Sequence, residues 1–329
     1  MIKAFVFGKF LPFHKGHEAM IQFALMHCNW LTVLVCASDT ENIPGAVRKS
    51  WIERAFQQEA RLEVKVFDYS EKELPNSSAS SESISAIWAA IFKLQFPGYS
   101  MVVTSEPYGT FVANEMGIQH IPFDLAKKQF PVSATSIRNH LIDNWNYLPA
   151  SVKPYYAIKV AVLGTESTGK TTLTEKLCSY FGCSIVSEAG RNIIDDSNEF
   201  CFEDLTLVAK EHAKRIDTAV AGNHALIIMD TDIYITKSYA GFIFEKQLEV
   251  STAIMESNKA QLYLYLNNDV DYFQDGTRLS EADRNLLDLS HRKTLHDHQI
   301  KFKEITGNWD KRFLSAVAHI NNLIEHVSK

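Results

Sequence analysis

The segment Gly164-Thr165-Glu166-Ser167-Thr168-Gly169-Lys170-Thr171 follows an apolar run from Ala157 to Leu163 and precedes a segment with helical periodicity. The spacing Gly-x4-Gly-Lys-Thr is typical of a P-loop, in which backbone N–H groups wrap a triphosphate and glycine permits the tight turns. An ordinary glycine-rich turn is the alternative, but strand, loop and helix occur in the order that a P-loop requires. The pattern predicts ATP-binding residues at Gly164, Glu166, Ser167, Thr168, Gly169, Lys170, Thr171 and Thr172. Within it, Lys170 is expected at the β- and γ-phosphates and Thr171 on Mg²⁺.

Length and composition predict a globular protein of two domains. The chain has 329 residues, of which 46% are hydrophobic and 22% charged, and each half is long enough to bury its own core. The net charge of −6 gives no general basic surface, which disfavours non-specific binding of nucleic acid.

The sequence also predicts a cytoplasmic location. Met1 leads directly into a strand-like run, Ile2 to Phe7, without the basic and apolar regions of a signal peptide. No apolar run approaches the roughly 20 residues that span a bilayer. The five cysteines include no Cys-x2-Cys pair, so reduced thiols are expected rather than disulfides or structural zinc.

Strand-like and helix-like segments alternate along both halves, which predicts two α/β domains, each a doubly wound parallel sheet. The fold prediction is a Rossmann-like N-terminal domain over residues 1–150 and a P-loop domain over residues 155–329, divided at Pro149–Pro154. Strands are expected at Ile2–Phe7, Leu31–Ala37, Glu63–Phe67, Met101–Thr104, Ile118–Ile121, Lys159–Leu163, Ser184–Val186, Ala225–Met229, Gln261–Leu266 and Glu304–Thr306. Helices are expected at Gly16–Asn29, Ala46–Ala60, Ser83–Gln95, Ser136–Asn144 and Trp309–Val327.

A second candidate phosphate site, Gly8-Lys9-Phe10-Leu11-Pro12-Phe13-His14-Lys15-Gly16-His17, directly follows the first strand. Ligands of doubly wound sheets lie beyond the carboxyl ends of the strands, where helix N-termini offer free N–H groups. His14 and His17 would flank such a ligand and stabilise charge on a phosphate oxygen. A zinc pair lacks an identifiable third ligand. Histidines that only cap or pack remain an alternative, although Gly8, Pro12 and Gly16 favour a ligand-binding turn.

The stretch Ser133-Ala134-Thr135-Ser136-Ile137-Arg138 resembles a helix N-terminus. Arg138 is unfavourable there unless an anion binds, because cations suit the other end of a helix. Ser105–Gly109, after another strand, is either part of a base or ribose pocket or a simple turn. Lys15 and Lys9 would add positive charge to the phosphate pocket, or are solvated surface residues.

Charged residues beyond the P-loop suit a small-molecule kinase. Glu188 and Arg191 follow one expected strand, and Asp230 and Asp232 follow the next, so they face the ligand crevice. We expect Asp230 to bind Mg²⁺, and Glu188 or Asp232 to orient an acceptor hydroxyl or take its proton. An aspartate after a strand can also simply cap a helix.

Asp275-Gly276-Thr277-Arg278 suits a lid in which Arg278 binds phosphate, or else a solvated helix face. His291, His296 and His298 fit no common zinc spacing and are expected at the surface.

Two stretches resemble the nucleotidylyltransferase superfamily. Its signature Gly-x-Phe-x-Pro-x-His-x-Gly-His is matched at Gly8, Phe10, Pro12, His14, Gly16 and His17, and its Ser-x-Thr-x-Ile-Arg stretch at Ser133, Thr135, Ile137 and Arg138. The resemblance implies that His14 and His17 stabilise the transition state at the α-phosphorus. It also implies that Arg138, with the N–H groups near Thr135 and Ser136, holds the β- and γ-phosphates.

The order of motifs along the whole chain resembles the bifunctional NadR-type family, a nicotinamide mononucleotide adenylyltransferase joined to a ribosylnicotinamide kinase. The resemblance implies ATP and Mg²⁺ as cofactors, and nicotinamide riboside and nicotinamide mononucleotide as substrates. Some members begin with a helix-turn-helix domain; because the first strand starts at Ile2, we expect none here and no DNA binding. The alternative is an adenylyltransferase for another phosphomonoester, such as phosphopantetheine or a flavin nucleotide, fused to a P-loop nucleotide-sensing module. A homo-oligomer remains open.

Overall fold

The computed structural model describes residues 1–76, 81–194, 200–270, 272 and 279–327. The chain divides into two compact units, Met1–Lys153 and Pro154–Lys329, each built on its own sheet. All strand pairings are parallel. The prediction of an α/β fold with two parallel sheets is therefore confirmed.

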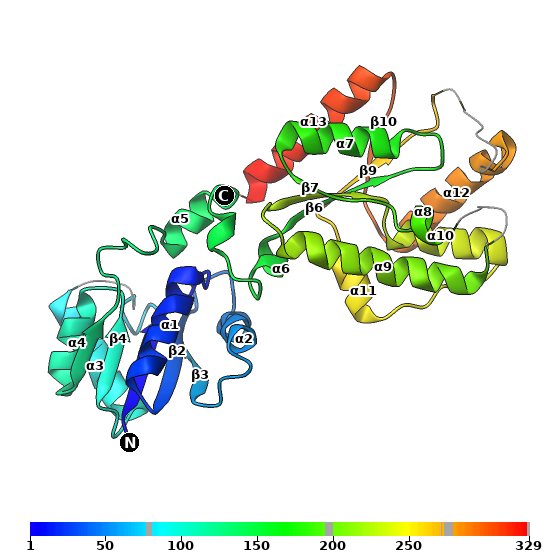
Figure 1. Cartoon of the computed structure of the whole chain (residues 1–329). Coiled ribbons are helices and arrows are strands. Elements are labelled where there is room, and N and C mark those ends of the chain that lie inside the picture. The colour runs from blue at the N-terminus through cyan, green and yellow to red at the C-terminus, as the bar shows by residue number, and fades with distance from the viewer. Residues whose placement is uncertain (77–80, 195–199, 271, 273–278, 328–329) are drawn as a thin grey trace. The chain divides into compact units, whose positions relative to one another are not determined.

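The first unit contains a five-stranded sheet in the order β3-β2-β1-β4-β5 (Figure 1). Its strands are β1 (Lys3–Gly8), β2 (Trp30–Ser38), β3 (Leu62–Tyr69), β4 (Met101–Thr104) and β5 (Gln119–Pro122). Its helices are α1 (Lys15–His27), α2 (Gly45–Ala55), α3 (Glu82–Gln95), α4 (Tyr108–Met116) and α5 (Ala134–Asn139), with a 3-10 turn over Trp145–Tyr147. Since β1 is central, the Gly8–His17 loop leaves the middle of the sheet.

Aromatic side chains fill the space between this sheet and helices α3 and α4. Phe5 of β1 stacks on Phe96 at a centroid distance of 4.4 Å, and Phe7 lies 4.5 Å from Phe92. Trp88 joins the same buried cluster. Large aromatic rings bury about 150–250 Å² each, so this packing holds β1 and the loop that follows it firmly in place.

The second unit contains a five-stranded sheet in the order β10-β9-β6-β8-β7, with α7 and α13 on one face and α9, α10, α11 and α12 on the other (Figure 1). Its strands are β6 (Ile158–Leu163), β7 (Ser184–Val186), β8 (Leu226–Asp230), β9 (Leu262–Leu266) and β10 (Lys303–Ile305). Its helices are α6 (Lys153–Tyr156), α7 (Lys170–Phe181), α8 (Gly190–Ile193), α9 (Phe202–Ala221), α10 (Ile233–Phe244), α11 (Thr252–Asn258), α12 (Glu281–Asp297) and α13 (Trp309–Val327). Strands β6 and β8 are buried throughout, as strands covered on both faces must be.

The structure corrects the expected secondary structure at four places. Helix α2 ends at Ala55, not Ala60. Residues 108–116, where only a turn or pocket was expected at the start, form helix α4. Helix α5 ends at Asn139, not Asn144. The expected boundary segment contains a helical turn, α6. Helix ends are weakly marked in a sequence, because terminal turns fray and because Ser, Thr and Asn side chains, as at the end of α5, compete for backbone hydrogen bonds.

Candidate active sites

The P-loop connects β6 to α7, and several of its residues have a left-handed backbone conformation. Gly164, Ser167 and Gly169 all have positive φ values, of 140°, 61° and 83°. Inside the loop, the carbonyl of Thr165 accepts bonds from Lys170 Nζ at 2.9 Å and from Thr168 Oγ1 at 2.8 Å. Because α7 begins at Lys170, its first backbone N–H groups lack partners within the helix. The site can therefore bind an anion at this helix end.

A chain of polar contacts joins the P-loop to the ends of β7 and β8. Thr171 Oγ1 donates to Asp230 Oδ2 at 2.5 Å and accepts from Arg191 Nη2 at 2.9 Å. Arg191 Nε in turn donates to Glu188 Oε2 at 3.2 Å. The structure thus brings together four residues predicted from separate segments of the sequence.

The Thr171–Asp230 pair fits a magnesium ion. Mg²⁺ prefers oxygen ligands and usually takes only one or two from the protein, with phosphate and water supplying the rest. Asp230 Oδ1 is buried and has no hydrogen-bond partner among the described residues, so a carboxylate oxygen remains available. Within the same part of the chain, no group of three or more His, Cys, Asp or Glu side chains could form an all-protein metal site.

Asp232 occupies a different position from Asp230. It is the N-cap of α10, its Oδ1 accepts from the N–H groups of Tyr234 and Ile235 at 2.9 and 3.0 Å, and its exposed fraction is 0%. Burial raises the pKa of Asp232 to about 7, against the effect of those two backbone bonds. The structure thus gives Asp232 Oδ1 a helix-capping role, while its Oδ2 is buried without a hydrogen-bond partner among the described residues. A contact between Asp232 and an acceptor hydroxyl stays a prediction.

Residues of α10 and of the segment that leads into α12 contact Glu166 of the P-loop. Glu166 accepts from Tyr239 Oη at 3.5 Å and from the N–H of Leu279 at 3.2 Å. His291 is fully buried, with Nδ1 2.8 Å from Ser238 Oγ. Burial and the nearby Lys170 lower the pKa of His291 to about 3. The expectation of a surface His291 is therefore wrong, although His296 and His298 are exposed.

Arg312 of α13 fixes the loops behind the phosphate site. Its guanidinium is fully buried and donates to the carbonyls of Thr168, Asn267 and Gly307 at 2.8–2.9 Å, and it pairs with Asp269. These partners lie in the loops after β6, β9 and β10. An arginine 144 residues from Thr168 carries no local sequence signal, so sequence reasoning missed it. The predicted lid residue Arg278 lies outside the described residues.

The N-terminal site is built around two stacked imidazole rings. His14 is the N-cap of α1 and accepts from Gly16 N–H at 3.2 Å, and its ring centroid lies 3.7 Å from that of His17. Phe10 and Phe13 lie 5.0 and 6.2 Å from the His17 ring. Burial, assisted by Lys127, lowers the pKa of His14 to about 4; burial, His14 and Lys127 lower that of His17 well below its usual value. Both rings are neutral at pH 7.

Arg138 connects the two halves of the predicted adenylyl-transfer site. Its Nη1 donates to the carbonyl of Leu11 in the histidine loop, and its Nη2 to Thr135 Oγ1 at 3.2 Å. Ser133 is the N-cap of α5 and accepts from Ser136 N–H at 3.0 Å. The two motifs, more than 100 residues apart, therefore share one end of the sheet.

Three lysines near this site have different environments. Lys127 acts electrostatically on both histidines and pairs with Glu106 at 3.1 Å. Lys9 instead pairs with Glu41 at 2.9 Å, and Lys15 is exposed. Lys127 is thus a candidate phosphate-site residue that sequence reasoning missed, because no motif contains it.

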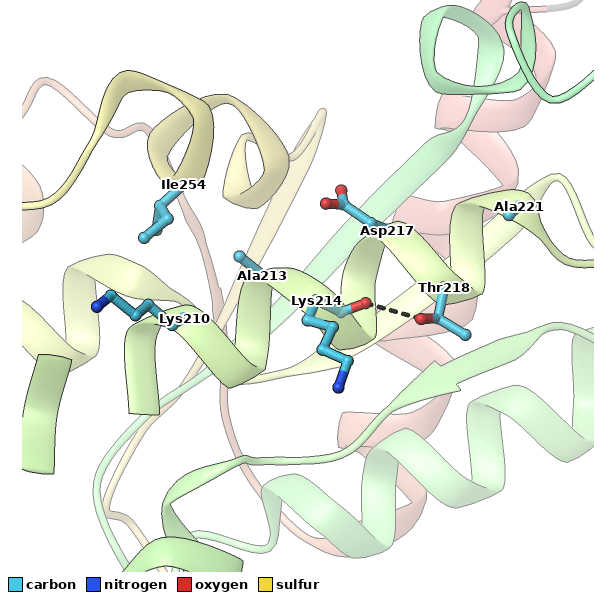
Figure 2. Close-up of a pocket in the computed structure, with 7 residues that line it drawn as sticks. All are labelled: Lys210, Ala213, Lys214, Asp217, Thr218, Ala221 and Ile254. Atoms are coloured by element: carbon cyan, nitrogen blue, oxygen red, sulfur yellow. Dashed lines mark hydrogen bonds between the residues drawn. The ribbon is translucent and has the colours of Figure 1, made fainter. Parts of the chain in front are cut away.

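A hollow of about 580 Å³ lies elsewhere on the second unit, between α9 and α11 (Figure 2). Its lining includes Lys210, Lys214 and Asp217 of α9 and Ile254 of α11. Asp217 accepts from Ser257 Oγ at 2.8 Å, which joins the two helices. No residue of the P-loop or of the Asp230 contacts lines this hollow, so it is not part of the phosphate site.

The fold and these two loops define the class: a protein of two α/β units, of which the second is a P-loop domain. A family model described as an AAA domain matches residues 159–312. The chain is 26% identical to the trifunctional NAD biosynthesis/regulator protein NadR of Salmonella typhimurium (strain LT2) and 24% identical to that of Escherichia coli (strain K12). Each alignment covers 97% of this chain and 82% of the relative.

Solved structures of NadR proteins have the same fold as this chain. A crystal structure of NadR protein in complex with NAD and AMP-PNP matches 98% of this chain and 95% of its own, with a TM-score of 0.66 and 19% identity. A second, in complex with NR, matches 97% and 95% with the same TM-score and identity. The chain is similar in sequence to the NadR proteins along 97% of its length. No helix of the described ranges is long and apolar enough to cross a membrane.

Proposed function

We propose that this protein is a bifunctional enzyme of NAD biosynthesis. The second unit would transfer the γ-phosphoryl group of ATP to the 5′-hydroxyl of nicotinamide riboside. The first unit would join the resulting mononucleotide to AMP from a second ATP, giving NAD and pyrophosphate. The observation that carries the kinase half is the 2.5 Å contact between Thr171 of the P-loop and Asp230 of β8. The NAD assignment is supported by homology to proteins named for NAD biosynthesis.

In the kinase half, the chain's residues position the reacting groups and stabilise charge. Lys170 and the N–H groups at the start of α7 would bind phosphate oxygens. Thr171 and Asp230 would hold Mg²⁺, which when bound offsets the negative charge of the phosphates. Glu188 is partly exposed and fixed by Arg191, so it is our candidate to orient the acceptor hydroxyl and accept its proton.

In the adenylyl-transfer half, no protein nucleophile is required. A phosphate oxygen of the mononucleotide would attack the α-phosphorus of ATP directly, and pyrophosphate would leave. His14 and His17 would donate hydrogen bonds to the oxygens at that phosphorus, where charge develops. Arg138, already held between the two motifs, would bind the departing phosphates. Alignment of the two substrates supplies much of the remaining acceleration.

A reciprocal pair of variants tests this proposal. Lys170→Ala should abolish phosphorylation of nicotinamide riboside while leaving NAD formation from the mononucleotide near the wild-type rate. His17→Ala should do the reverse. Both are measured on purified full-length protein, with ADP release for the first reaction and NAD formation for the second. Loss of both activities in either variant would rule out two independent sites.

The acceptors are tested by substitution of the substrate. Phosphopantetheine and flavin mononucleotide should give no pyrophosphate release above background under conditions in which nicotinamide mononucleotide does. Riboside-dependent ADP release should be rapid and should require Lys170. Faster adenylylation of another phosphomonoester, together with riboside-independent ADP release, would instead favour an adenylyltransferase joined to a nucleotide-sensing module.

A further inference from the structure

Trp309 is a half-exposed indole that lies directly on the P-loop. It is the first residue of α13 and 51% of its surface is exposed. A Cβ added to Gly169 would lie 2.3 and 2.4 Å from its ring atoms Cζ3 and Cη2. Tryptophan is highly buried on average. An indole that both touches a phosphate-binding loop and faces solvent therefore suggests a ligand.

The position of Trp309 is held rigidly by its own helix. Arg312, one turn further along α13, is fully buried and bonds the carbonyls of Thr168 and Gly307. The N–H of Gly307 donates to Asp269 Oδ2 at 2.7 Å. These contacts attach the start of α13 to the P-loop before any ligand binds, so the indole is pre-organised.

The location of the indole matches what a nucleotide needs beyond its phosphates. Ligands of such sheets bind outside the carboxyl ends of the strands, and the P-loop encloses only the triphosphate. The base must then lie beside the loop, where a flat aromatic surface stabilises it by stacking. A packing role alone would explain the contact with Gly169 but not the exposed half of the ring.

We propose that Trp309 provides the surface on which the base of the nucleoside triphosphate stacks in the second unit. This assignment rests on the proposed kinase function of the P-loop. Stacking uses the face of the base and not its edge, so Trp309 stabilises a purine nucleotide without selecting adenine over guanine.

The test compares ATP with inorganic tripolyphosphate, which has no base. KM for ATP in riboside phosphorylation is measured for wild type, Trp309→Phe and Trp309→Ala, and Ki for Mg²⁺-tripolyphosphate is measured as a competitor. Trp309→Ala should raise KM for ATP about 5- to 150-fold, the range given by loss of one stacked base. Ki for GTP, measured as a second competitor, should rise by a similar factor. Ki for tripolyphosphate should change by less than about twofold, and Trp309→Phe should stay within about threefold of wild type.

A matched control uses Leu314, which is 64% exposed on the same helix; Leu314→Ala should leave KM for ATP unchanged. Equal losses for ATP and tripolyphosphate in Trp309→Ala would show that the indole only supports the loop and would overturn the proposal. An unchanged KM for ATP would overturn it as well.

Fluorescence separates this proposal from the assignment of the acceptor. Trp309 is the one tryptophan of the second unit, since Trp30, Trp51, Trp88 and Trp145 belong to the first. The part of the emission change on adding an ATP analogue that Lys170→Ala abolishes should be present in wild type and absent in Trp309→Phe, because a signal from ATP bound in the first unit does not depend on Lys170. Tripolyphosphate should cause no such change in either protein. If no riboside is phosphorylated but this signal appears and requires Lys170, the base-stacking surface stands and the riboside kinase function fails. An identical signal in wild type and Trp309→Phe would reject the stacking.

Discussion

The two phosphate loops of this protein use opposite kinds of chemical groups. The N-terminal loop presents two stacked histidines among phenylalanine rings, and burial keeps their pKa values below the usual range. The C-terminal loop presents a lysine, a hydroxyl and an aspartate, linked to Arg191 and Glu188. The first loop therefore offers neutral hydrogen-bonding groups, whereas the second offers charged groups and the oxygen atoms that a magnesium ion would prefer. The difference teaches that a similar strand–loop–helix scaffold can support two chemistries.

The largest effect is expected from Asp230, the carboxylate that we propose as a magnesium ligand. Asp230→Ala removes the partner of Thr171 Oγ1 and the proposed magnesium ligand, so riboside phosphorylation should fall about 10²- to 10³-fold, as for loss of one group that stabilises transition-state charge. NAD formation from the mononucleotide should be unchanged. Both rates are measured at saturating Mg²⁺.

Asp232→Ala is the matched control for Asp230→Ala. It removes a helix cap, so it should lower the free energy of unfolding by about 1 kcal/mol and leave most of the kinase activity. If Asp232→Ala inactivated the kinase more than Asp230→Ala in a folded protein, the assigned roles of the two aspartates would be reversed.

Glycine substitutions compare how tightly each loop is packed. Gly169 has φ +83°, and an added Cβ would overlap the Trp309 ring, so Gly169→Ala should reduce kcat/KM for ATP in the kinase reaction about 100-fold; backbone strain alone costs roughly 1–2 kcal/mol. Gly16 has no positive φ, and its Cβ would meet His14 at 3.0–3.1 Å. Gly16→Ala should reduce adenylyl transfer only about tenfold, because a small ring shift relieves the contact.

The control for the glycine comparison is Gly182→Ala. Gly182 has φ +60° but open space around it, so it isolates backbone strain from collision. It should lower stability by about 1 kcal/mol without changing either rate. A kinase defect in Gly182→Ala as large as that in Gly169→Ala would show that strain in the unit, and not the contact with Trp309, causes the loss.

The buried histidines make both units less stable in acid. The folded pKa is lowered to about 4 for His14 and about 3 for His291, whereas the unfolded chain binds these protons near pH 6.5. The unfolded state therefore takes up more protons below that pH, and each histidine should reduce the free energy of unfolding by about 2 kcal/mol between pH 6.5 and 5.

Urea unfolding at pH 7 and pH 5 measures this effect. His291→Gln should make the stability of the second unit less dependent on pH and leave the first unit unchanged, while His14→Gln should do the opposite. An unchanged pH dependence in both variants would mean that these imidazoles titrate normally in the folded protein.

The smallest effect is expected at the second N-terminal motif. Ser133→Ala removes the side-chain cap of α5, so it should cost about 1 kcal/mol and raise KM for ATP in adenylyl transfer a few-fold, with riboside phosphorylation unchanged. Ser251→Ala removes a similar cap from α11, a helix that contributes no residue to either loop, and should raise neither KM. Equal KM values for Ser133→Ala and wild type would show that the cap of α5 does not contribute to ATP binding.

The elements that could be predicted from sequence have local signals. Alternating apolar segments predicted the two parallel sheets, and glycine spacing predicted the conformation around Gly169 and the loop from Gly8 to His17. Helix α4 was missed because the segment Pro107-Tyr108-Gly109 favours a turn. His291 was misplaced because a polar side chain carries no local mark of burial, which depends here on packing of α12 against α10.

By itself, the sequence determined the class of the two units and the positions of both candidate phosphate loops, because backbone turns and helix starts depend on residues a few positions apart. Only the tertiary structure decided that Asp230 contacts Thr171 while Asp232 caps a helix, and that Lys127, Arg312 and Trp309 lie beside the loops. The physical reason is that side chains distant in sequence meet only through strand order and helix packing. Those long-range contacts determine which charged or aromatic groups face the ligand crevice.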